Sequence, residues 1–259
     1  MKRSVFFVYG VVCYLLFLIV YVYFACFVAN FRVPWTIDFG PSLPLAWAVA
    51  VDVGLLLLFA LQHSIMARPA FKHFWTRLVP QPIERSTYVL ASCLVLILLM
   101  WQWRPINVVI WDVQSPLGWG LLAGIFAAGW LAVPLVSLMI NHFDLFGTRQ
   151  VWLHWQGQPY KPLPFTTPLA YGWVRHPLYV AWAMAFWATP TMTLGHLLLA
   201  SALTIYMIAA SRVEERDLVA HFGKVYEDYQ RRVPAFVPMA RRVVADPAAA
   251  VPAASSEGA

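Results

Sequence analysis

Long apolar segments, separated by short polar ones, set the pattern of this chain. Four of these segments are long enough to cross a bilayer as helices, which takes about 20 apolar residues each. They cover residues 4–29, 45–66, 86–103 and 116–140. The pattern therefore predicts four membrane-spanning helices. In the last of them, Gly120 and Gly124 form a GxxxG motif, which predicts close packing against another helix.

A further apolar run, residues 178–210, predicts a change of direction. Its 33 residues are too many for one straight helix and fewer than the roughly 40 that two full spans need. Pro190 and Gly195 supply a break near the middle of the run. We therefore expect a tight helical hairpin that returns the chain to the membrane surface from which it came.

After the hairpin, residues 211–221 have the pattern of a further helix. Apolar and aromatic positions recur there at spacings of three and four residues, which is the mark of one helical face: Leu218, Phe222, Val225 and Tyr229. Glu214 lies one turn before Leu218, so we expect its side chain to point inward. Gly223 is expected to end this helix.

The composition supports a membrane protein, because 61% of the 259 residues are hydrophobic and only 12% are charged. A soluble domain has about 25% charged residues. We predict an all-α fold, a polytopic integral membrane bundle with four spans, a carboxyl-terminal hairpin and a cytoplasmic helix. Residues 1–242 would form one membrane-embedded domain. Residues 243–259, rich in Ala, Pro and Ser, would be a disordered tail.

The net charge of +6 comes from basic residues beside the apolar spans. Such residues set membrane orientation, so they do not indicate a nucleic-acid partner. Alternate loops are basic, which places both termini in the cytoplasm of a bacterial inner membrane. The first apolar run is longer than the 7–15 or so residues of a signal-peptide core. The three cysteines lie in apolar segments and predict neither a disulfide nor a metal site, and no feature points to a protein partner.

The candidate chemistry lies at the two ends of the predicted hairpin. Arg175, His176 and Tyr179 precede it, and Glu214 and Glu215 follow it. Each group alone is also consistent with an interfacial anchor or a solvated acidic pair. Together, a carboxylate can hold an ammonium group, a guanidinium or imidazole can hold a carboxylate, and an aromatic face can hold a sulfonium cation. S-adenosylmethionine presents all of these groups, so we predict that residues 171–238 form the core of its binding site.

Four short motifs in this region resemble those of the superfamily of isoprenylcysteine carboxyl methyltransferases and phospholipid methyltransferases. They are RHPLY at 175–179, EERDL at 214–218, FGKVYEDY at 222–229 and RVP at 232–234. The resemblance implies a membrane methyltransferase whose donor site is lined by Tyr171, His176, Tyr179, Glu214 and Glu215. It also implies Arg175 and Arg232 near the acceptor, with His176 as a weaker candidate for a base. The family usually has a glycine where this chain has Leu169.

The rest of the chain resembles a narrower group, the bacterial methanethiol S-methyltransferases. The similar segments are residues 62–77, 84–90, 101–106 and 141–153. The resemblance implies methylation of a small thiol, methanethiol, to dimethyl sulfide. Other acceptors, a prenylcysteine carboxylate or a phospholipid amine, and a non-enzymatic membrane sensor are the alternatives. Asn141, His142 and Arg149 would line the acceptor side, or would cap the fourth helix and tie down the following loop.

Overall fold

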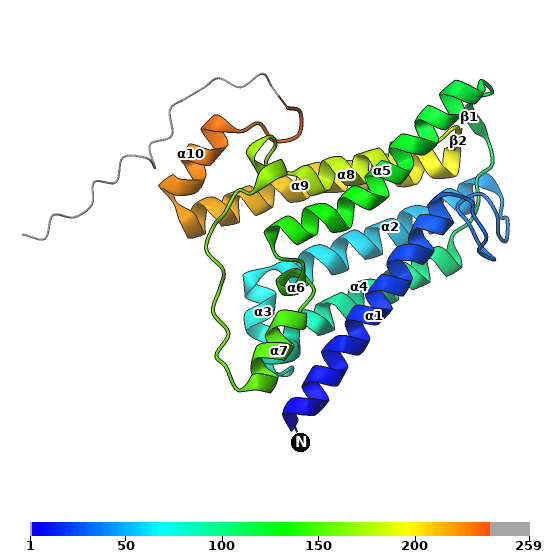
Figure 1. Ribbon diagram of the computed structural model, residues 1–259. Coiled ribbons are helices and arrows are strands. Elements are labelled where there is room, and N and C mark those ends of the chain that lie inside the picture. The colour runs from blue at the N-terminus through cyan, green and yellow to red at the C-terminus, as the bar shows by residue number, and fades with distance from the viewer. Residues whose placement is uncertain (1, 239–259) are drawn as a thin grey trace, which may run out of the picture.

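The computed structural model describes residues 2–238, and it is a bundle of helices (Figure 1). Within that range, five helices are long and apolar enough to cross a membrane. They are α1 (Lys2–Val28), α2 (Leu45–Ala67), α4 (Glu84–Gln102, preceded by the short turn η1, Gln81–Ile83), α5 (Pro116–Ile140) and α9 (Leu194–Phe222). The predicted all-α membrane fold is confirmed. The tail predicted at 243–259 lies outside the described residues.

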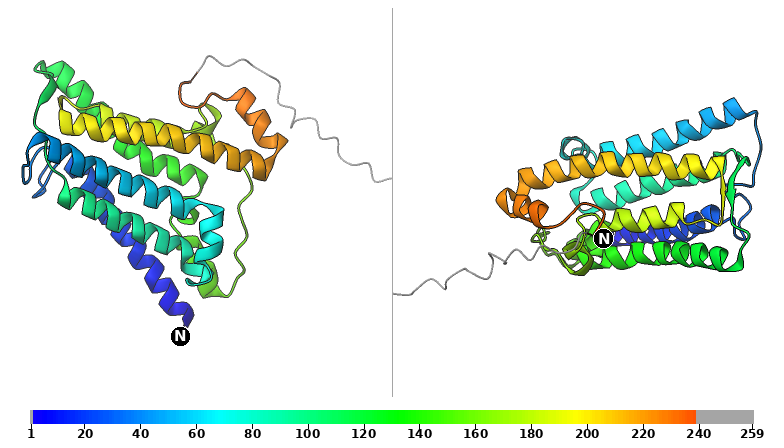
Figure 2. Two further views of the ribbon diagram at one scale, coloured as in Figure 1. Left: turned by 180° about the vertical axis from the view of Figure 1, so that it is seen from behind. Right: turned by 90° about the horizontal axis from the view of Figure 1, so that it is seen from above.

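The shorter elements lie at the two ends of the bundle (Figures 1 and 2). One end, which we call the basic end, has the start of α1, α3 (Pro69–Trp75), α6 (His142–Leu145), α7 (Thr148–Gln156), η2 (Leu169–Gly172) and α10 (Lys224–Arg232). At the opposite end, β1 (Val109–Asp112) pairs with β2 (Thr191–Thr193) in an antiparallel ladder. Of the Lys and Arg residues that the structure describes, only Arg32 and Arg104 lie at this opposite end.

The chain returns to the basic end as predicted, but the hairpin is unequal. Its first arm, α8 (Pro177–Trp187), has 11 residues and is about 16 Å long, whereas the 29 residues of α9 extend about 43 Å at 1.5 Å per residue. The extended residues 188–193 make up part of the difference. The separate helix expected at 211–221 is wrong, because α9 continues without a break until Gly223, which has a φ of +56°.

The turn of the hairpin is fixed by backbone hydrogen bonds to the segment between α4 and α5. Val109 is the register partner of Thr193, and the amide of Gly195 donates to the carbonyl of Ile106 at 3.1 Å. The Thr193 side chain accepts from the amide of His196 at 3.2 Å and so caps the start of α9. A Ser, Thr, Asp or Asn at this position satisfies an otherwise unpaired amide of the first turn.

The segment between α5 and α8 contains the short helices α6 and α7. Asn141 is in the left-handed conformation with φ +100°, and its side chain accepts from the amide of Asp144 at 3.1 Å. The basic segment after α2 likewise contains α3. These helices are too short and too polar for an apolar span, which is why the pattern of apolar runs did not predict them.

The packing of α5 against α8 depends on one glycine, and it is not part of the GxxxG motif. A Cβ atom at Gly129 would lie 2.6 Å from the amide nitrogen of Ala185 and 3.0 Å from the carbonyl oxygen of Ala181. At Gly120 and Gly124 a Cβ atom would meet no atom of the described residues within 4 Å. The sequence-based prediction of close packing at Gly120 and Gly124 is therefore wrong, and the backbones of α5 and α8 approach each other at Gly129.

Replacing Gly129 by Ala is predicted to destabilise the bundle, although Ala favours helices over Gly by about 1 kcal/mol. The new methyl group would meet backbone, which cannot rotate away, and overpacking of this kind costs about 1–3 kcal/mol. Thermal unfolding of the protein purified in detergent measures the effect. Gly124→Ala is the matched control on the same helix, and its melting temperature should equal or exceed that of the parent. Equal melting temperatures for the two variants would contradict the packing described here.

Candidate active site

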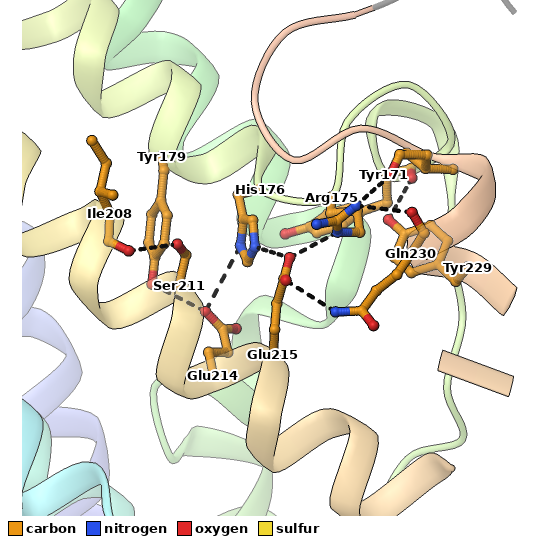
Figure 3. A network of polar contacts seen from close by, with 11 residues as sticks. Tyr171, Arg175, His176, Tyr179, Ile208, Ser211, Glu214, Glu215, Tyr229 and Gln230 are labelled. Atoms are coloured by element: carbon orange, nitrogen blue, oxygen red, sulfur yellow. Dashed lines mark hydrogen bonds and ion pairs between the residues drawn. The ribbon is translucent and has the colours of Figure 1, made fainter. Parts of the chain in front are cut away.

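The site lies at the basic end, where the start of α8 meets the last turns of α9 beneath α10 (Figure 3). His176 is the residue immediately before α8, and Pro177 is the first residue of that helix. Proline suits this position because its φ is already helical and its missing N–H has no partner to lose. The Arg-His-Pro sequence therefore directs two cationic or polar side chains to the beginning of the helix.

The carboxylate of Glu215 is the centre of the site and accepts from three side chains. Arg175 Nε donates to Glu215 Oε1 at 2.7 Å, His176 Nε2 contacts the same oxygen at 2.8 Å, and Gln230 Nε2 donates to Oε2 at 3.0 Å. Arg175 also donates from one terminal nitrogen to the carbonyls of Gln230 (3.1 Å) and Val233 (2.6 Å). We call Arg175, His176, Glu215 and Gln230 the Glu215 cluster; it joins the start of α8, α9 and α10.

Glu214 is the more exposed member of the acidic pair, which corrects the expectation that it points inward. Its side chain is 49% exposed, against 17% for Glu215. Successive residues on a helix are about 100° apart, so the pair spans the edge of the packed face. Tyr179 donates to Glu214 Oε2 at 3.1 Å, and His176 Nδ1 lies 3.9 Å from the same oxygen.

Aromatic rings fix the imidazole of His176. Tyr179 stacks on it with the two planes within 6° and the ring centroids 5.3 Å apart. Phe236 lies against it at 5.4 Å. The side chain of His176 is only 6% exposed. Because Glu215 accepts at Nε2, that nitrogen carries a hydrogen, and Nδ1 faces Glu214 (Figure 3).

The segment after α10 closes the site through backbone hydrogen bonds. The amides of Arg175 and His176 donate to the carbonyls of Pro234 (2.9 Å) and Ala235 (3.0 Å). Tyr229 is one helical turn earlier and donates its hydroxyl to the carbonyl of Tyr171 at 2.6 Å. This bond places the η2 turn, and with it Tyr171, beside the cluster (Figure 3).

Burial keeps the tyrosines around the site protonated. It raises the pKa of Tyr229 to about 12, and it also raises the pKa of Tyr171, which lies near Glu214. Both hydroxyls therefore remain hydrogen-bond donors at neutral pH. Leu169 adopts a φ of +44°. A side chain at positive φ is strained, so a glycine would fit this turn better than leucine does.

Arg232 is an exposed residue in the last turn of α10. Its Nε donates to the carbonyl of Asp228 at 3.2 Å, one turn earlier in the same helix. Arg175 is committed to Glu215 and to two carbonyls. The roles of Arg175, Arg232 and His176 toward the acceptor stay predictions.

The other predicted substrate residues form a separate group between α1, α5 and α7. His142 is buried, with Nε2 2.7 Å from the hydroxyl of Tyr14 and Nδ1 2.7 Å from that of Ser137. Burial lowers its pKa, so the imidazole is neutral at pH 7. These contacts show that His142 ties α1 to α5. They match the second interpretation of this loop, in which its polar residues hold the fold together.

Asn141 and Arg149 line a cavity of about 450 Å³, together with Phe7, Phe143, Thr148 and Trp152. Arg149 also pairs with Asp144 at 2.9 Å. No contact within residues 2–238 joins this cavity to the Glu215 cluster. The structure therefore brings Tyr171, Arg175, His176, Tyr179, Glu214 and Glu215 together and leaves Asn141, His142 and Arg149 in a second group.

Two residues of the site were missed by the sequence analysis. Gln230 holds the second oxygen of Glu215, and Phe236 covers His176. Gln230 is four residues after the buried Tyr226, so it shares a helical face with it, and this spacing could have found it. Phe236 lies between Pro234 and Pro238 in an irregular segment, and no periodic pattern marks it.

Within the described residues no group of three or more His, Cys, Asp or Glu side chains is placed to hold a metal ion. The site instead has the half-exposed carboxylate of Glu214 and, near it, the aromatic ring of Tyr179. The second carboxylate, Glu215, is already paired with Arg175 and His176. Such a set can bind a cationic organic molecule.

Comparisons with known proteins decide the family. A methanethiol S-methyltransferase from Crocosphaera subtropica is 49% identical over 238 residues, which are 92% of this chain and 93% of the relative. One from Mycobacterium tuberculosis is 49% identical over 242 residues, 93% and 99% of the two chains. This chain belongs to the methanethiol S-methyltransferase family.

A more distant relative, Nurim from Sus scrofa, is 34% identical over 186 residues, which are 68% of each chain. No protein-family model and no solved structure matches the chain. The narrower resemblance stated from the sequence is thus confirmed.

Replacing Glu215 by Ala is predicted to destabilise the protein by about 3 kcal/mol, because it leaves Arg175 and His176 without their carboxylate partner in a largely buried place. Chemical unfolding in detergent measures this loss. The matched control is Asp217→Ala on the same helix. Asp217 pairs with Arg68 at 2.9 Å, but its side chain is 52% exposed, so the loss should be less than about 1 kcal/mol. Similar losses for both variants would show that Glu215 is not the junction of the site.

Proposed function

We propose that this protein transfers a methyl group to methanethiol and produces dimethyl sulfide. The observation that carries the proposal is the 49% identity, over more than nine-tenths of both chains, to proteins named methanethiol S-methyltransferase. Methyl transfer to sulfur is an in-line displacement, so it depends chiefly on positioning. Good orientation of two reactants can contribute about 7–11 kcal/mol to such a reaction.

We infer that the methyl donor is S-adenosylmethionine, which supplies an activated methyl group on a sulfonium sulfur. The residues of the site fit it. Both contacts of Glu214 with described residues involve Oε2, and the half-exposed carboxylate has room to accept from an ammonium or hydroxyl group. The faces of Tyr179 and Tyr171 suit a cation or an aromatic ring. Glu215, whose two oxygens already accept from three side chains, would act by positioning His176 and Arg175.

The donor site would thus consist of Tyr171, His176, Tyr179 and Glu214, with Glu215 behind them. We assign Arg175 to positioning, because its guanidinium already binds one carboxylate and two carbonyls. Arg232 is exposed on α10, and its role near the acceptor, which rests on the resemblance alone, stays a prediction. Asn141, His142 and Arg149 hold α1, α5 and α7 together in this proposal.

We further propose that the basic end faces the cytoplasm of a bacterial inner membrane. Lysine and arginine accumulate in loops on the cytoplasmic side, and among the described residues only Arg32 and Arg104 lie at the opposite end. The start of α1 and the end of α10 both lie at the basic end (Figure 1). Both termini and the donor site would therefore be cytoplasmic.

The methyl transfer is tested in cells that express the protein and are fed methanethiol. Dimethyl sulfide in the headspace should rise well above that of cells with the empty vector. A donor with a labelled methyl group should pass the label to the product of the purified protein. The alternative acceptors, a prenylcysteine and phosphatidylethanolamine, are assayed beside methanethiol. Label in one of these and none in dimethyl sulfide would replace the proposed acceptor, and no transfer at all would indicate a non-enzymatic protein.

The donor site is tested in the same preparation by calorimetry with S-adenosylmethionine. Glu214→Gln should weaken binding about 10- to 100-fold, because a hydrogen bond to a charged group contributes about 1.5–3 kcal/mol. Glu227→Gln on the exposed face of α10 is the matched control and should bind like the parent. An unchanged affinity for Glu214→Gln would remove this residue from the donor site.

The orientation is tested with reporter fusions after Ala259. A fluorescent protein that folds only in the cytoplasm should be bright there, and alkaline phosphatase, which needs an oxidising compartment, should be inactive. The reverse pattern would place the donor site on the outer side. A fusion after Gly40, between α1 and α2, is the control that should give the opposite result.

A further inference from the structure

A second group of polar side chains lies inside the bundle, between α2, α4 and α9. It shares no residue with the donor site, although α9 contributes to both groups. We call it the His63 cluster, and it consists of Gln62, His63, Ser64, Tyr88, Ser92 and Tyr206.

The cluster is organised around the imidazole of His63. The hydroxyl of Tyr88 lies 2.9 Å from Nε2 and 3.0 Å from Nδ1, and that of Ser92 lies 3.3 Å from Nδ1. The hydroxyl of Ser64 donates to that of Tyr206 at 3.2 Å. The rings of His63 and Tyr206 meet edge to face. Three helices therefore contribute hydroxyl groups around one titratable ring.

One atom of the cluster has no partner in the structure. The amide nitrogen of Gln62 donates to Ser92 and contacts the sulfur of Met66. Its carbonyl oxygen, Oε1, is buried and accepts from no group of the described residues. An unsatisfied polar atom away from water costs free energy, so its presence needs a reason. A ligand with a hydrogen to donate would supply one, and a thiol S–H is such a donor.

The His63 cluster is connected to the donor site along α9. Tyr206 of the cluster lies about two turns before Glu214 on this helix. Tyr179 is the residue that donates to Glu214 at 3.1 Å. A molecule held among these tyrosines would therefore lie beside a donor bound at Glu214.

The surroundings suit a small apolar acceptor. The ring of Phe59, one helical turn earlier on α2, stacks on His63 with centroids 5.3 Å apart. Ionisable and polar residues within membrane helices are costly and mark functional sites by default. An apolar thiol that partitions into lipid can reach this position without crossing the polar surface.

We propose that the His63 cluster is the acceptor site, where the methanethiol sulfur binds and the imidazole of His63 takes its proton. The inference rests on the proposed methyl transfer. The S–H bond breaks and its proton passes to a ring nitrogen of His63. The sulfur lone pair then forms a bond to the donor methyl carbon, whose bond to the sulfonium sulfur breaks with both electrons. The proton leaves the imidazolium for water, and the products are dimethyl sulfide and the neutral demethylated donor.

Groups on every neighbouring element bear on the titration of His63. Tyr88 faces it from α4 and Tyr206 from α9, with Tyr179 on α8 and Glu214 on α9 beyond them. The charged groups within electrostatic range of Tyr88 or Tyr206 are Arg68, Glu84 and Arg85. In His63→Gln these groups are all retained, so a difference in pH dependence reports on the imidazole itself.

The test compares His63→Gln with the parent protein in methyl transfer from S-adenosylmethionine to methanethiol between pH 7 and pH 9. Glutamine keeps a hydrogen-bonding group but cannot take a proton. At pH 7 we expect kcat/KM for methanethiol to fall about 100-fold, within the range for loss of a general base. The rate of the variant should rise nearly tenfold per pH unit, because it depends on thiolate formed in solution, while the parent changes little. His73→Gln, an exposed histidine on α3, is the matched control and should resemble the parent.

Three results separate the explanations. A parent protein that does not methylate methanethiol would overturn the proposed function and the acceptor site with it. An active parent with His63→Gln within threefold of it at pH 7, or with a parallel pH profile, would overturn only the role of His63. Donor affinity measured by calorimetry should be unchanged in His63→Gln, which distinguishes loss of the acceptor site from loss of the fold.

A second variant decides the case in which His63→Gln does not fold. Tyr206→Phe removes one hydroxyl that faces the proposed sulfur position and retains the ring. It should raise the KM for methanethiol at least fivefold and leave donor affinity within threefold of the parent. An unchanged KM would overturn the acceptor site, and equal losses in both measurements would show that the cluster has only a structural role.

Discussion

The site depends on one carboxylate, that of Glu215, which satisfies donors from α8 and α10 at the same time. A charged group at the edge of a membrane bundle is unfavourable unless its partners surround it. Arg175, His176 and Gln230 do so, and Arg175 in turn binds two carbonyls near the end of α10. These hydrogen bonds hold the end of α10 and the start of the following segment in place. The same contacts fix the imidazole that faces Glu214, so the carboxylate proposed to bind the donor and the one that supports it are adjacent residues.

This junction exists only because the chain reverses between α8 and α9 and does so in one register. The β1–β2 ladder and the hydrogen bond from Gly195 to Ile106 hold the turn at the opposite end. Since α8 is much shorter than α9, its first residue meets α9 well before that helix ends. The last turns of α9 therefore extend past the start of α8, and α10 folds back toward the start of α8. Close packing at Gly129 holds α8 against α5, which keeps this offset constant.

The sequence predicted the spans and the return of the chain, because hydrophobicity summed over about 20 residues exceeds local variation. It also predicted the group of residues at the site, because the hairpin determines which ends meet. It did not predict which glutamate is buried, since Glu214 and Glu215 differ by one step around the helix and the partner helix decides between them. Gly129 was missed for a related reason. Several small residues of α5 could allow close helix packing, and only the position of α8 decides which of them does. The short helices α6 and α7 were missed because they are too short and too polar to form an apolar run, whereas Gln230 could have been found from its spacing to Tyr226.

The proposed division between a polar donor site and an acceptor site inside the bundle follows from the chemistry of the two reactants. A thiol with the pKa of cysteine, near 8.5, needs about 2 kcal/mol to ionise at pH 7, which is small beside the 7–11 kcal/mol or so available from orientation. The proposed acceptor site therefore needs neither a strong base nor a permanent positive charge, which would be costly within the membrane. A neutral imidazole held by hydroxyl groups meets the smaller requirement. The cationic donor, in contrast, needs a carboxylate, and Glu214 lies at the basic end, where water can still solvate it.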